Sequence, residues 1–430
     1  MIVRFGIENF RSFKNEVQLD FVSNSHIPFD SKHKTKFGRL GIIKNLGIFG
    51  ANASGKTTLI SAIQEMRNFV LTSRISYNLS FKGKESKPTK FTLAFEDKKR
   101  FFEYSFSVKH NKMLGLVEVV DESLYELMLS GKSKEIYTRT NGLNEKNNLD
   151  LNTFVKGYSN TFGALFLTYI VAPERRVNGL QILDTLRQVY NYFLEKIFVV
   201  VHQHEFRFSI LEDSVSTIKE KLHEYDTGIE NVDFSNIIES EKKMLIDDRF
   251  VRNNIVMPLM NSSNIPPIYY SNDCDIFMFK KSEKGIEIKK LLFKHTNIKE
   301  PFSYRDESEG TKIIFCLIAT LLCQRNEERT VFIDEIERSS HPKAVKQAIL
   351  DFQKANANTN AQLVFTSHLA SLMDTVLQRD EIYFVEKDDF GISNVSSLQQ
   401  YKTRNRREQL SEKYLEGRYG AIPNIGVSIN

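Results

Sequence analysis

Apolar and polar residues follow three successive patterns along the chain. Residues 2–10 and 17–21 alternate at period two, which predicts two paired amino-terminal strands. Shorter runs of strand-forming residues follow at 91–95, 101–108, 116–120 and 135–137, and we expect them to form an antiparallel layer. From about residue 157 to residue 260 the apolar residues recur at helical spacing, most clearly between Leu183 and Leu194.

The last part of the chain alternates between strand and helix patterns. Strand candidates lie at 267–281, 286–294, 331–333 and 362–366, and helix candidates lie at 311–323 and 342–354. A strand at 46–49 followed by a helix at 57–69 repeats this order near the start. Such alternation predicts a largely parallel sheet that is covered on both faces. The predicted fold class is therefore α/β: a mixed, largely parallel sheet with an antiparallel β layer and a helical insertion.

The length of the chain predicts more than one lobe. At 430 residues the chain exceeds the size at which a single hydrophobic core stops growing. We expect residues 1–156 to form the first part of the main fold, residues 157–264 a mainly helical insertion or lobe, and residues 265–430 the second part of the main fold.

Composition and charge exclude some classes of protein and leave others open. Hydrophobic residues make up 41% and charged residues 26%, an ordinary globular balance. The longest apolar run, 313–323, is too short to cross a bilayer, and the amino end lacks a secretory signal pattern, so we expect a cytoplasmic protein without membrane contact. The net charge of +5 permits contact with nucleic acid without requiring it. The three cysteines lack metal-ligand spacing, which favours core packing.

A phosphate-binding motif lies between the strand at 46–49 and the helix at 57–69. It reads Gly50-Ala51-Asn52-Ala53-Ser54-Gly55-Lys56-Thr57, and Thr58 follows it. The glycines let successive backbone N–H groups face an anion, and the helix start adds partial positive charge. Lys56 is expected to reach the β and γ phosphates of ATP, and the Thr57 hydroxyl to bind Mg²⁺.

Two acidic residues end the apolar strand at 331–333. In the α/β fold, the carboxyl end of this strand is expected at the same sheet edge as the phosphate loop. Asp334 is the predicted second Mg²⁺ ligand, and Glu335 is the predicted catalytic base that polarises the attacking water. The strand at 362–366 ends at Thr366-Ser367-His368, and we expect His368 to contact the γ-phosphate or the attacking water.

A second phosphate-binding helix start is predicted before the helix at 311–323. Ser308, Gly310 and Thr311 stand at this start, where a serine hydroxyl and exposed N–H groups can hold an anion. In isolation, a plain helix cap explains the same residues. We expect the strand before Ser308 to belong to the same sheet as the strand before Lys56.

Taken together, these motifs resemble the AAA15-type ATPases, which are related to the ATPase heads of SMC, RecF and OLD proteins and of ABC transporters. The resemblance rests on the phosphate loop, on the acidic strand end at Asp334 and on five further segments. These are Ile7 to Phe13, Glu307 to Thr311 (similar to the ABC signature), Glu337 to Pro342 (the D-loop), Thr366 to His368 (the switch histidine) and Tyr414 to Pro423. Two departures are Glu309, where ABC proteins usually carry glycine, and the glutamine loop, for which Gln181 and Gln188 are both candidates.

The resemblance implies an ABC-type head of the P-loop NTPase class that forms a homodimer around ATP. Each site would use the phosphate loop of one chain and the signature of the other. Families of this kind often act in defence against phage beside a nuclease. Our leading hypothesis is an ATP-gated switch that controls such an effector. The alternative is a RecF-like repair ATPase that binds DNA itself, for which Lys402, Arg404, Arg406 and Arg407 are candidate contacts. Energising a transporter is a third, weaker hypothesis.

Overall fold

The computed structural model describes eleven stretches of the chain: residues 1–75, 79–111, 116–140, 163–171, 181–200, 215–261, 267–272, 275–283, 285–322, 328–401 and 409–422. The chain divides into two compact units. Unit 1 comprises Met1–Val201, Asn326–Ile336 and Asn356–Asn430, and unit 2 comprises His202–Arg325 and Glu337–Ala355. The predicted insertion at 157–264 therefore contributes to both units.

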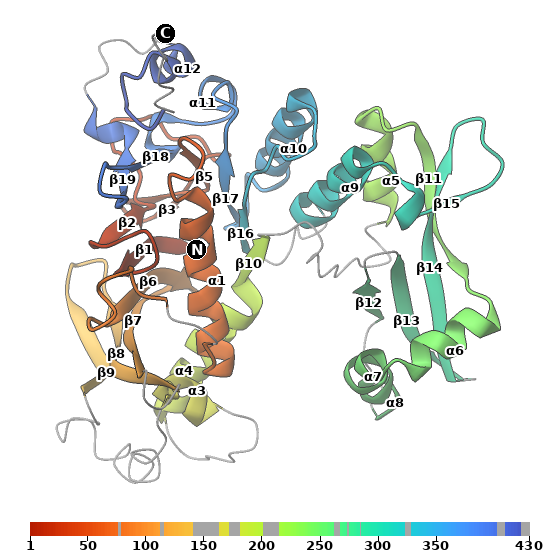
Figure 1. The fold of residues 1–430 in the computed structure, drawn as a ribbon, viewed down its shortest axis with the longest axis horizontal. Helices are drawn as coiled ribbons and strands as arrows, with labels where there is room; N and C mark the ends of the chain where they lie inside the picture. The colour runs from red at the N-terminus through yellow and green to blue at the C-terminus, as the bar shows by residue number, and fades with distance from the viewer. Residues whose placement is uncertain are drawn as a thin grey trace. The chain divides into compact units, whose positions relative to one another are not determined.

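Unit 1 contains the predicted parallel sheet (Figure 1). Its strand order is β10 (Ile197–Val200), β16 (Thr330–Ile333), β17 (Gln362–Ser367), β5 (Asn45–Phe49), β18 (Ile382–Lys387) and β19 (Ser393–Ser397). The first five strands are parallel to their neighbours, and β19 is antiparallel to β18. All residues of β5, β16 and β17 are buried, as expected for strands covered on both faces. The predicted mixed α/β fold is confirmed.

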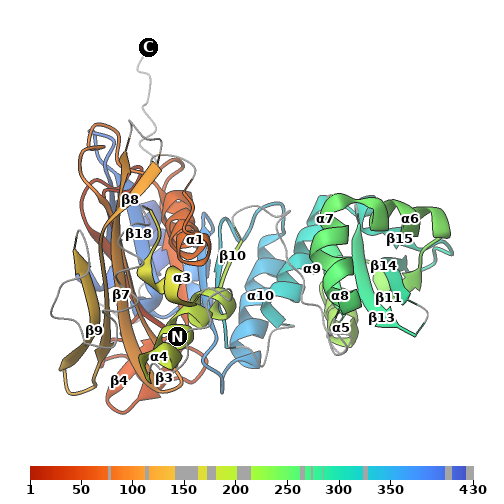
Figure 2. The same cartoon turned by 90° about the horizontal axis from the view of Figure 1, so that it is seen from below.

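A second sheet of unit 1 is the predicted antiparallel layer. Its order is β2 (Val17–Asp20), β1 (Ile2–Glu8), β6 (Thr89–Asp97), β7 (Arg100–Asn111), β8 (Leu116–Leu127) and β9 (Ser133–Thr140). Phe5 and Leu19 of this layer share a core with Ile48 and Val364 of the parallel sheet and with Ile60 of α1 (Lys56–Thr72). Figure 2 shows the antiparallel strands and α1 on opposite sides of β18. A sheet, rather than a helix layer, therefore covers one face of the parallel sheet.

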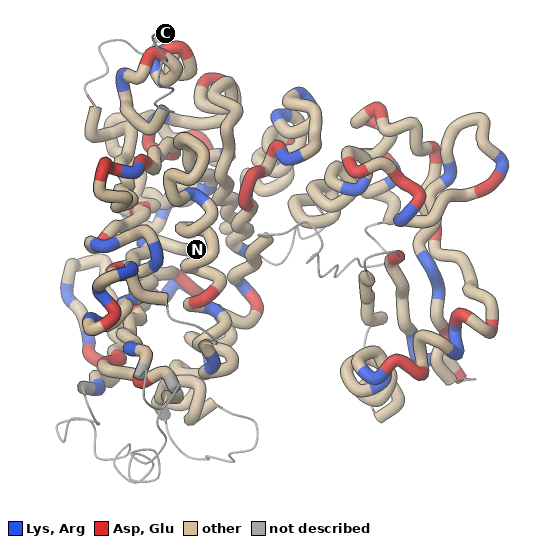
Figure 3. Tube along the Cα trace, in the orientation of Figure 1, with Lys and Arg blue, Asp and Glu red and all other residues tan. Residues whose placement is uncertain are grey.

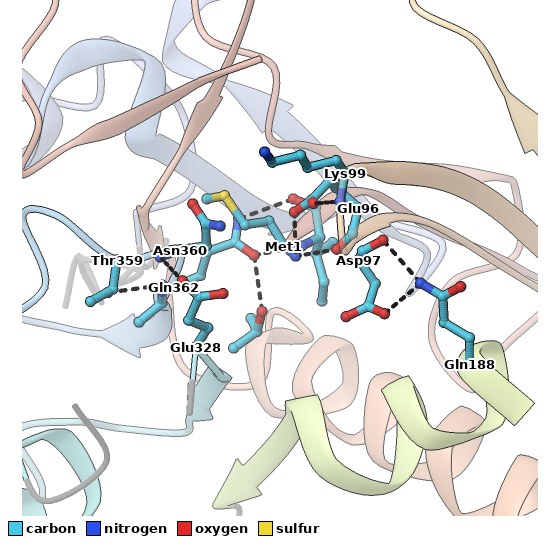
Figure 4. Close-up of polar contacts among 12 residues, drawn as sticks. Met1, Glu96, Asp97, Lys99, Gln188, Glu328, Thr359, Asn360 and Gln362 are labelled. Atoms are coloured by element: carbon cyan, nitrogen blue, oxygen red, sulfur yellow. Dashed lines mark hydrogen bonds and ion pairs between the residues drawn. The ribbon is translucent and has the colours of Figure 1, made fainter. Parts of the chain in front are cut away.

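Gln362 ties the amino-terminal strand to the parallel sheet (Figure 4). Its side-chain nitrogen donates to the backbone oxygens of Ile2, at 3.0 Å, and Ile43, at 2.9 Å. Its side-chain oxygen accepts from the Ile2 N–H and the Thr330 hydroxyl. Because Gln362 is fully buried, this pairing satisfies a polar side chain that would otherwise destabilise the core.

The remaining elements of unit 1 are short. They are β3 (Lys34–Phe37), β4 (Leu40–Ile43), α3 (Phe166–Val171), α4 (Gln181–Asn191), which continues into a π-helical turn at Tyr192–Lys196, α11 (Leu372–Thr375), α12 (Leu410–Leu415) and two 3₁₀ turns at Arg379–Glu381 and Leu398–Gln400. Gln188, on α4, donates to the Asp97 side chain at 2.7 Å and accepts from Arg100 at 3.1 Å (Figure 4 shows the contact with Asp97). This candidate for the glutamine loop is thus held at the β6–β7 turn.

Unit 2 combines an antiparallel sheet with helices. The sheet order is β11 (Ile229–Asn236), β14 (Gly285–His295), β13 (Ile276–Ser282) and β12 (Ile268–Ser271), and β15 (Phe302–Ser303) also pairs with β14. The helices are α5 (Val215–Glu224), α6 (Glu239–Asp247), α7 (Arg249–Val251), α8 (Met257–Asn261), α9 (Glu309–Leu322) and α10 (Pro342–Ala355), with a π turn at Arg252–Val256 and a 3₁₀ turn at Tyr304–Asp306. Val251, Ile255 and Leu259 form a core with Phe277 and Phe279 of the sheet.

One prediction about this sheet is wrong. The strands before Ser308, β14 and β15, pair only with each other, β11 and β13 among the described residues, and they do not belong to the sheet that precedes Lys56. Apolar periodicity identifies a strand without identifying the strand it pairs with, so the sequence could not separate the two sheets.

Cys316 is buried in α9, as core packing predicts, while Cys274 and Cys323 lie outside the described residues. In the described part of the chain, no helix is long and apolar enough to cross a membrane.

Candidate active site

The predicted catalytic segments of unit 1 follow three neighbouring parallel strands. The phosphate loop follows β5, His368 follows β17 and the acidic pair follows β16, and β17 lies between the other two strands. In register, Ser367 is opposite Phe49, and Phe365 is opposite Ile333. Because the carboxyl ends of parallel strands open at one edge of a sheet, these three segments begin at that shared edge.

Lys56 is buried at the first turn of α1 despite its charge. Its Nζ donates to the backbone oxygens of Gly50, at 2.8 Å, and Ala51, at 2.9 Å, so the side chain folds back over the loop it belongs to. A buried ammonium requires such partners, and the oxygens of a bound phosphate would be stronger ones. The site therefore holds a positive charge ready at the start of a helix.

Ser54 is a further polar group of the loop. Its side chain is buried, and its Oγ has no hydrogen-bond partner among the described residues. A buried hydroxyl without a partner costs free energy, and an anion in the loop could accept a hydrogen bond from it. This unsatisfied donor fits a phosphate ligand.

Thr366 organises the acidic strand end. Its Oγ1 donates to Asp334 Oδ1 at 2.6 Å and accepts from the Glu335 N–H at 2.7 Å. The Ile336 N–H donates to the backbone oxygen of Thr366 at 3.1 Å, which adds a second link between the two strand ends. Glu335 has a φ of +48°, a backbone conformation that non-glycine residues adopt uncommonly and that occurs at functional turns. Thr366 was not among the predicted site residues. The sequence feature that could have indicated this role is a hydroxyl residue near the end of β17, the strand next to the one that Asp334 and Glu335 follow.

His368 is exposed immediately beyond β17. The next backbone N–H, of Leu369, donates to Ser367 Oγ at 3.0 Å, which orders the turn that carries the histidine. The described geometry therefore places His368 at the same sheet edge as Glu335 and Lys56, accessible to a ligand.

The residues predicted to bind Mg²⁺ fit that ion when phosphate is also present. Thr57 offers a hydroxyl and Asp334 a carboxylate, and the described residues contain no cluster of three or more His, Cys, Asp or Glu that could hold a metal alone. Mg²⁺ commonly takes only one or two protein oxygens and completes its shell with water and substrate phosphates. The hydrogen bond from Thr366 orients the Asp334 carboxylate at the strand end.

Replacing Thr366 with valine is expected to lower ATP turnover at saturating ATP by roughly three- to tenfold, because Asp334 and Glu335 lose the hydroxyl that links them. Steady-state phosphate release measures this. Thr375→Val removes a hydroxyl at the end of α11 that donates to the backbone oxygen of Ser371, and should leave turnover unchanged. Equal turnover in the two variants would contradict the organising role of Thr366.

The second predicted phosphate-binding set lies in unit 2. Ser308 precedes α9, and its Oγ accepts from the Thr311 N–H at 3.1 Å, as a helix cap does. Glu309, at the position where ABC proteins usually carry glycine, forms an exposed ion pair with Lys312 at 2.9 Å. Ser308 is exposed and Gly310 is the second residue of α9. The predicted helix start is present and capped by Ser308, while its binding of an anion stays a prediction.

Residues 206–374 match the family model described as "AAA domain, putative AbiEii toxin, Type IV TA system". The chain contains a segment similar to an AAA domain. The match covers less than half of the chain and includes Ser308, Asp334 and His368, and the phosphate loop lies before it. No curated protein matches the chain.

Among the solved structures that match the chain are two SMC head domains. One, described as an SmcHead bound to the C-winged helix domain of ScpA, is 14% identical with a TM-score of 0.41, over 93% of this chain and 98% of that one. The other, the SMC head domain from Thermotoga maritima, is 12% identical with a TM-score of 0.34, over 92% of this chain and 98% of that one.

Proposed function

We propose that this chain binds ATP with Mg²⁺ and hydrolyses it to ADP and phosphate. The observation that carries the proposal is the placement of the phosphate loop, the acidic pair and His368 after three neighbouring parallel strands. The similarity of residues 206–374 to an AAA domain supports an ATPase assignment.

Each residue has a distinct role in the proposed reaction. Backbone N–H groups of residues 50–58 bind the phosphates, and Lys56 exchanges its loop carbonyls for phosphate oxygens. Thr57 and Asp334 would hold Mg²⁺, which would neutralise charge at the phosphates. Glu335 accepts a proton from the attacking water, and His368 donates a hydrogen bond at the γ-phosphate.

The proposed active form is a homodimer in which Ser308, Gly310 and Thr311 of one chain close over ATP held by the phosphate loop of the other. Two features support this. Ser308 is exposed, and the amino end of α9 carries the partial positive charge of a helix start, which is suited to a γ-phosphate. Lys56 and Ser308 follow strands of different sheets, so strand order alone does not place one helix start relative to the other. The shared site therefore depends on a direct test.

Mixing two inactive variants should restore ATPase activity. Lys56→Ala lacks the phosphate-binding cation, and Ser308→Arg blocks closure with a bulky cation. A heterodimer of the two contains one doubly damaged site and one site in which both residues are intact. Because random pairing makes half of the dimers heterodimers, activity should recover to about a quarter of the unmodified value per chain. Phosphate release by each variant and by the equimolar mixture measures this.

The matched control mixes Lys56→Ala with the double variant Lys56→Ala/Ser308→Arg, a pair in which no site has Lys56 and no activity should return. Light scattering with ATP present determines whether heterodimers form. If the Glu335→Gln protein stays monomeric at saturating ATP, the shared site is wrong. Heterodimers that form and stay inactive would instead indicate that both sites must act together.

The proposed biological role is a dimeric switch that regulates an effector such as a nuclease in defence against phage. The family description of residues 206–374 names a putative toxin of a type IV toxin–antitoxin system, a setting in which one protein controls a harmful activity. A RecF-like ATPase that binds DNA directly is the alternative. Its candidate contacts, Lys402, Arg404, Arg406 and Arg407, lie outside the described residues. Figure 3 shows basic and acidic residues interspersed in each unit.

Binding to duplex DNA across a salt series separates the two roles. A direct DNA-binding ATPase should bind with an affinity that falls steeply as salt rises, because each phosphate contact releases counterions. A switch that acts through a protein partner should bind duplex DNA weakly at physiological salt, with and without ATP. Tight, salt-sensitive binding would favour the RecF-like alternative.

A further inference from the structure

The hairpin of β18 and β19 packs directly against the two glycines of the phosphate loop. A Cβ atom on Gly50 would lie 2.2 Å from the backbone oxygen of Val385, in β18. A Cβ atom on Gly55, whose φ is +119°, would lie 2.7 Å from Ser393 Oγ, at the start of β19. Both distances are far below van der Waals contact. The glycines therefore let the hairpin pack closely against the outside of the loop, and they also allow the loop to turn.

Ser393 is the hairpin residue that bonds to the loop. Its Oγ donates to the backbone oxygen of Ser54 at 2.6 Å. The Ser393 side chain is also anchored from the amino-terminal region, because its Oγ lies 2.9 Å from Ser12 Oγ, and the Ser393 N–H donates to the Ser12 oxygen at 2.8 Å. Ser393 is 1% exposed, so these bonds form away from water. Three segments that are far apart in sequence thus meet at one hydroxyl.

The bond to Ser54 constrains a peptide group that the proposed site needs. Ser54 and Gly55 share a peptide unit, and in a planar trans peptide the C=O and N–H groups point in opposite directions. When Ser393 holds the Ser54 oxygen toward the hairpin, the Gly55 N–H points away from the hairpin. Gly55 has no side chain to restrict its own rotation, so an external bond is needed to fix this orientation before a ligand arrives.

We propose that Ser393 is a positioning residue of the phosphate loop, which holds the Ser54–Gly55 peptide in the orientation that binds phosphate. The inference rests on the proposed function, since it assumes that the Ser54–Gly55 peptide binds a phosphate of ATP. It adds a residue more than 300 positions away from the motif, on a strand that none of the sequence motifs includes.

Ser393→Ala tests the proposal, with Ser397→Ala as its matched control. Ser397 is also a buried serine on β19, and its Oγ accepts from the Gln399 N–H at 3.2 Å without contacting the loop. Both changes are made in the Glu335→Gln background so that ATP binding is measured without turnover. Ser393→Ala should weaken ATP binding roughly two- to tenfold, the range expected for one lost hydrogen bond, whereas Ser397→Ala should not.

Hydrogen exchange of the nucleotide-free proteins gives a second readout that does not depend on ATP. The amides of residues 51–56 should exchange faster in Ser393→Ala than in Ser397→Ala, while the melting temperatures of the two stay similar. Equal ATP affinity and equal loop exchange in the two variants would overturn the positioning role of Ser393 and leave the proposed ATPase function standing. If the Glu335→Gln parent binds no ATP, the proposed function fails, and the positioning role fails with it.

Discussion

Lys56→Ala is expected to abolish ATP binding or to weaken it strongly. Lys56 is the buried cation of the phosphate loop, and its Nζ already lies within 3 Å of two loop carbonyls. In the loop the ammonium bonds to neutral carbonyl oxygens, whereas with ATP it would bond to anionic phosphate oxygens, so that both partners are charged. Alanine removes both the charge and the donors. Isothermal calorimetry with ATP and Mg²⁺ measures the loss.

Two further variants show whether weaker ATP binding comes from the lost charge of Lys56 or from unfolding of the protein. Lys56→Met keeps most of the buried aliphatic volume and should bind ATP as poorly as Lys56→Ala. Lys346→Ala removes an exposed lysine of α10 and should bind ATP normally. Thermal unfolding of all three should show that they are folded. Unchanged affinity in Lys56→Met would refute the assignment of Gly50 to Thr57 as the phosphate loop.

Glu335→Gln is expected to keep ATP binding and to lower turnover by about a hundredfold or more, because the amide has the shape of the carboxylate but cannot accept the proton of the attacking water. The backbone bond from the Glu335 N–H to Thr366 is unaffected by this change, so the strand end should keep its geometry. Single-turnover phosphate release, combined with calorimetry, separates hydrolysis from binding.

Glu230→Gln is the matched control, since it neutralises an exposed acid on β11, outside the predicted site. It should hydrolyse ATP at close to the unmodified rate. Full activity in Glu335→Gln would move the catalytic role to another group, with His368 and Asp334 the next residues to replace.

Short motifs and local periodicity were the features that the sequence could predict. The strand at 46–49, the phosphate loop and the following helix are contiguous, so their order is visible in the sequence, and the structure has β5 and α1 there. The acidic strand end at Asp334 is likewise contiguous with β16. The roles of Lys56, Asp334, Glu335 and His368 remain predictions, although the described strands bring their segments to one edge of one sheet.

Features that depend on long-range pairing were not predictable in the same way. Nothing in residues 286–294 indicates that this strand pairs with β11 and β13 rather than with the strands beside the phosphate loop. Strand β10, at the edge of the parallel sheet, was hidden because its four apolar residues continue a helical stretch. The contacts of Thr366 with Asp334 and of Ser393 with Ser54 join residues 32 and 339 positions apart, and no local pattern encodes them.

Hydrolysis of ATP at the loop of Lys56 is tested most directly by phosphate release from the purified protein with ATP and Mg²⁺, beside Lys56→Met purified in the same way. We expect steady release of phosphate and ADP in equal amounts by the unmodified protein, and none above background by Lys56→Met. Equal release by both proteins, or no release by the unmodified protein at any concentration at which it dimerises, would contradict this expectation.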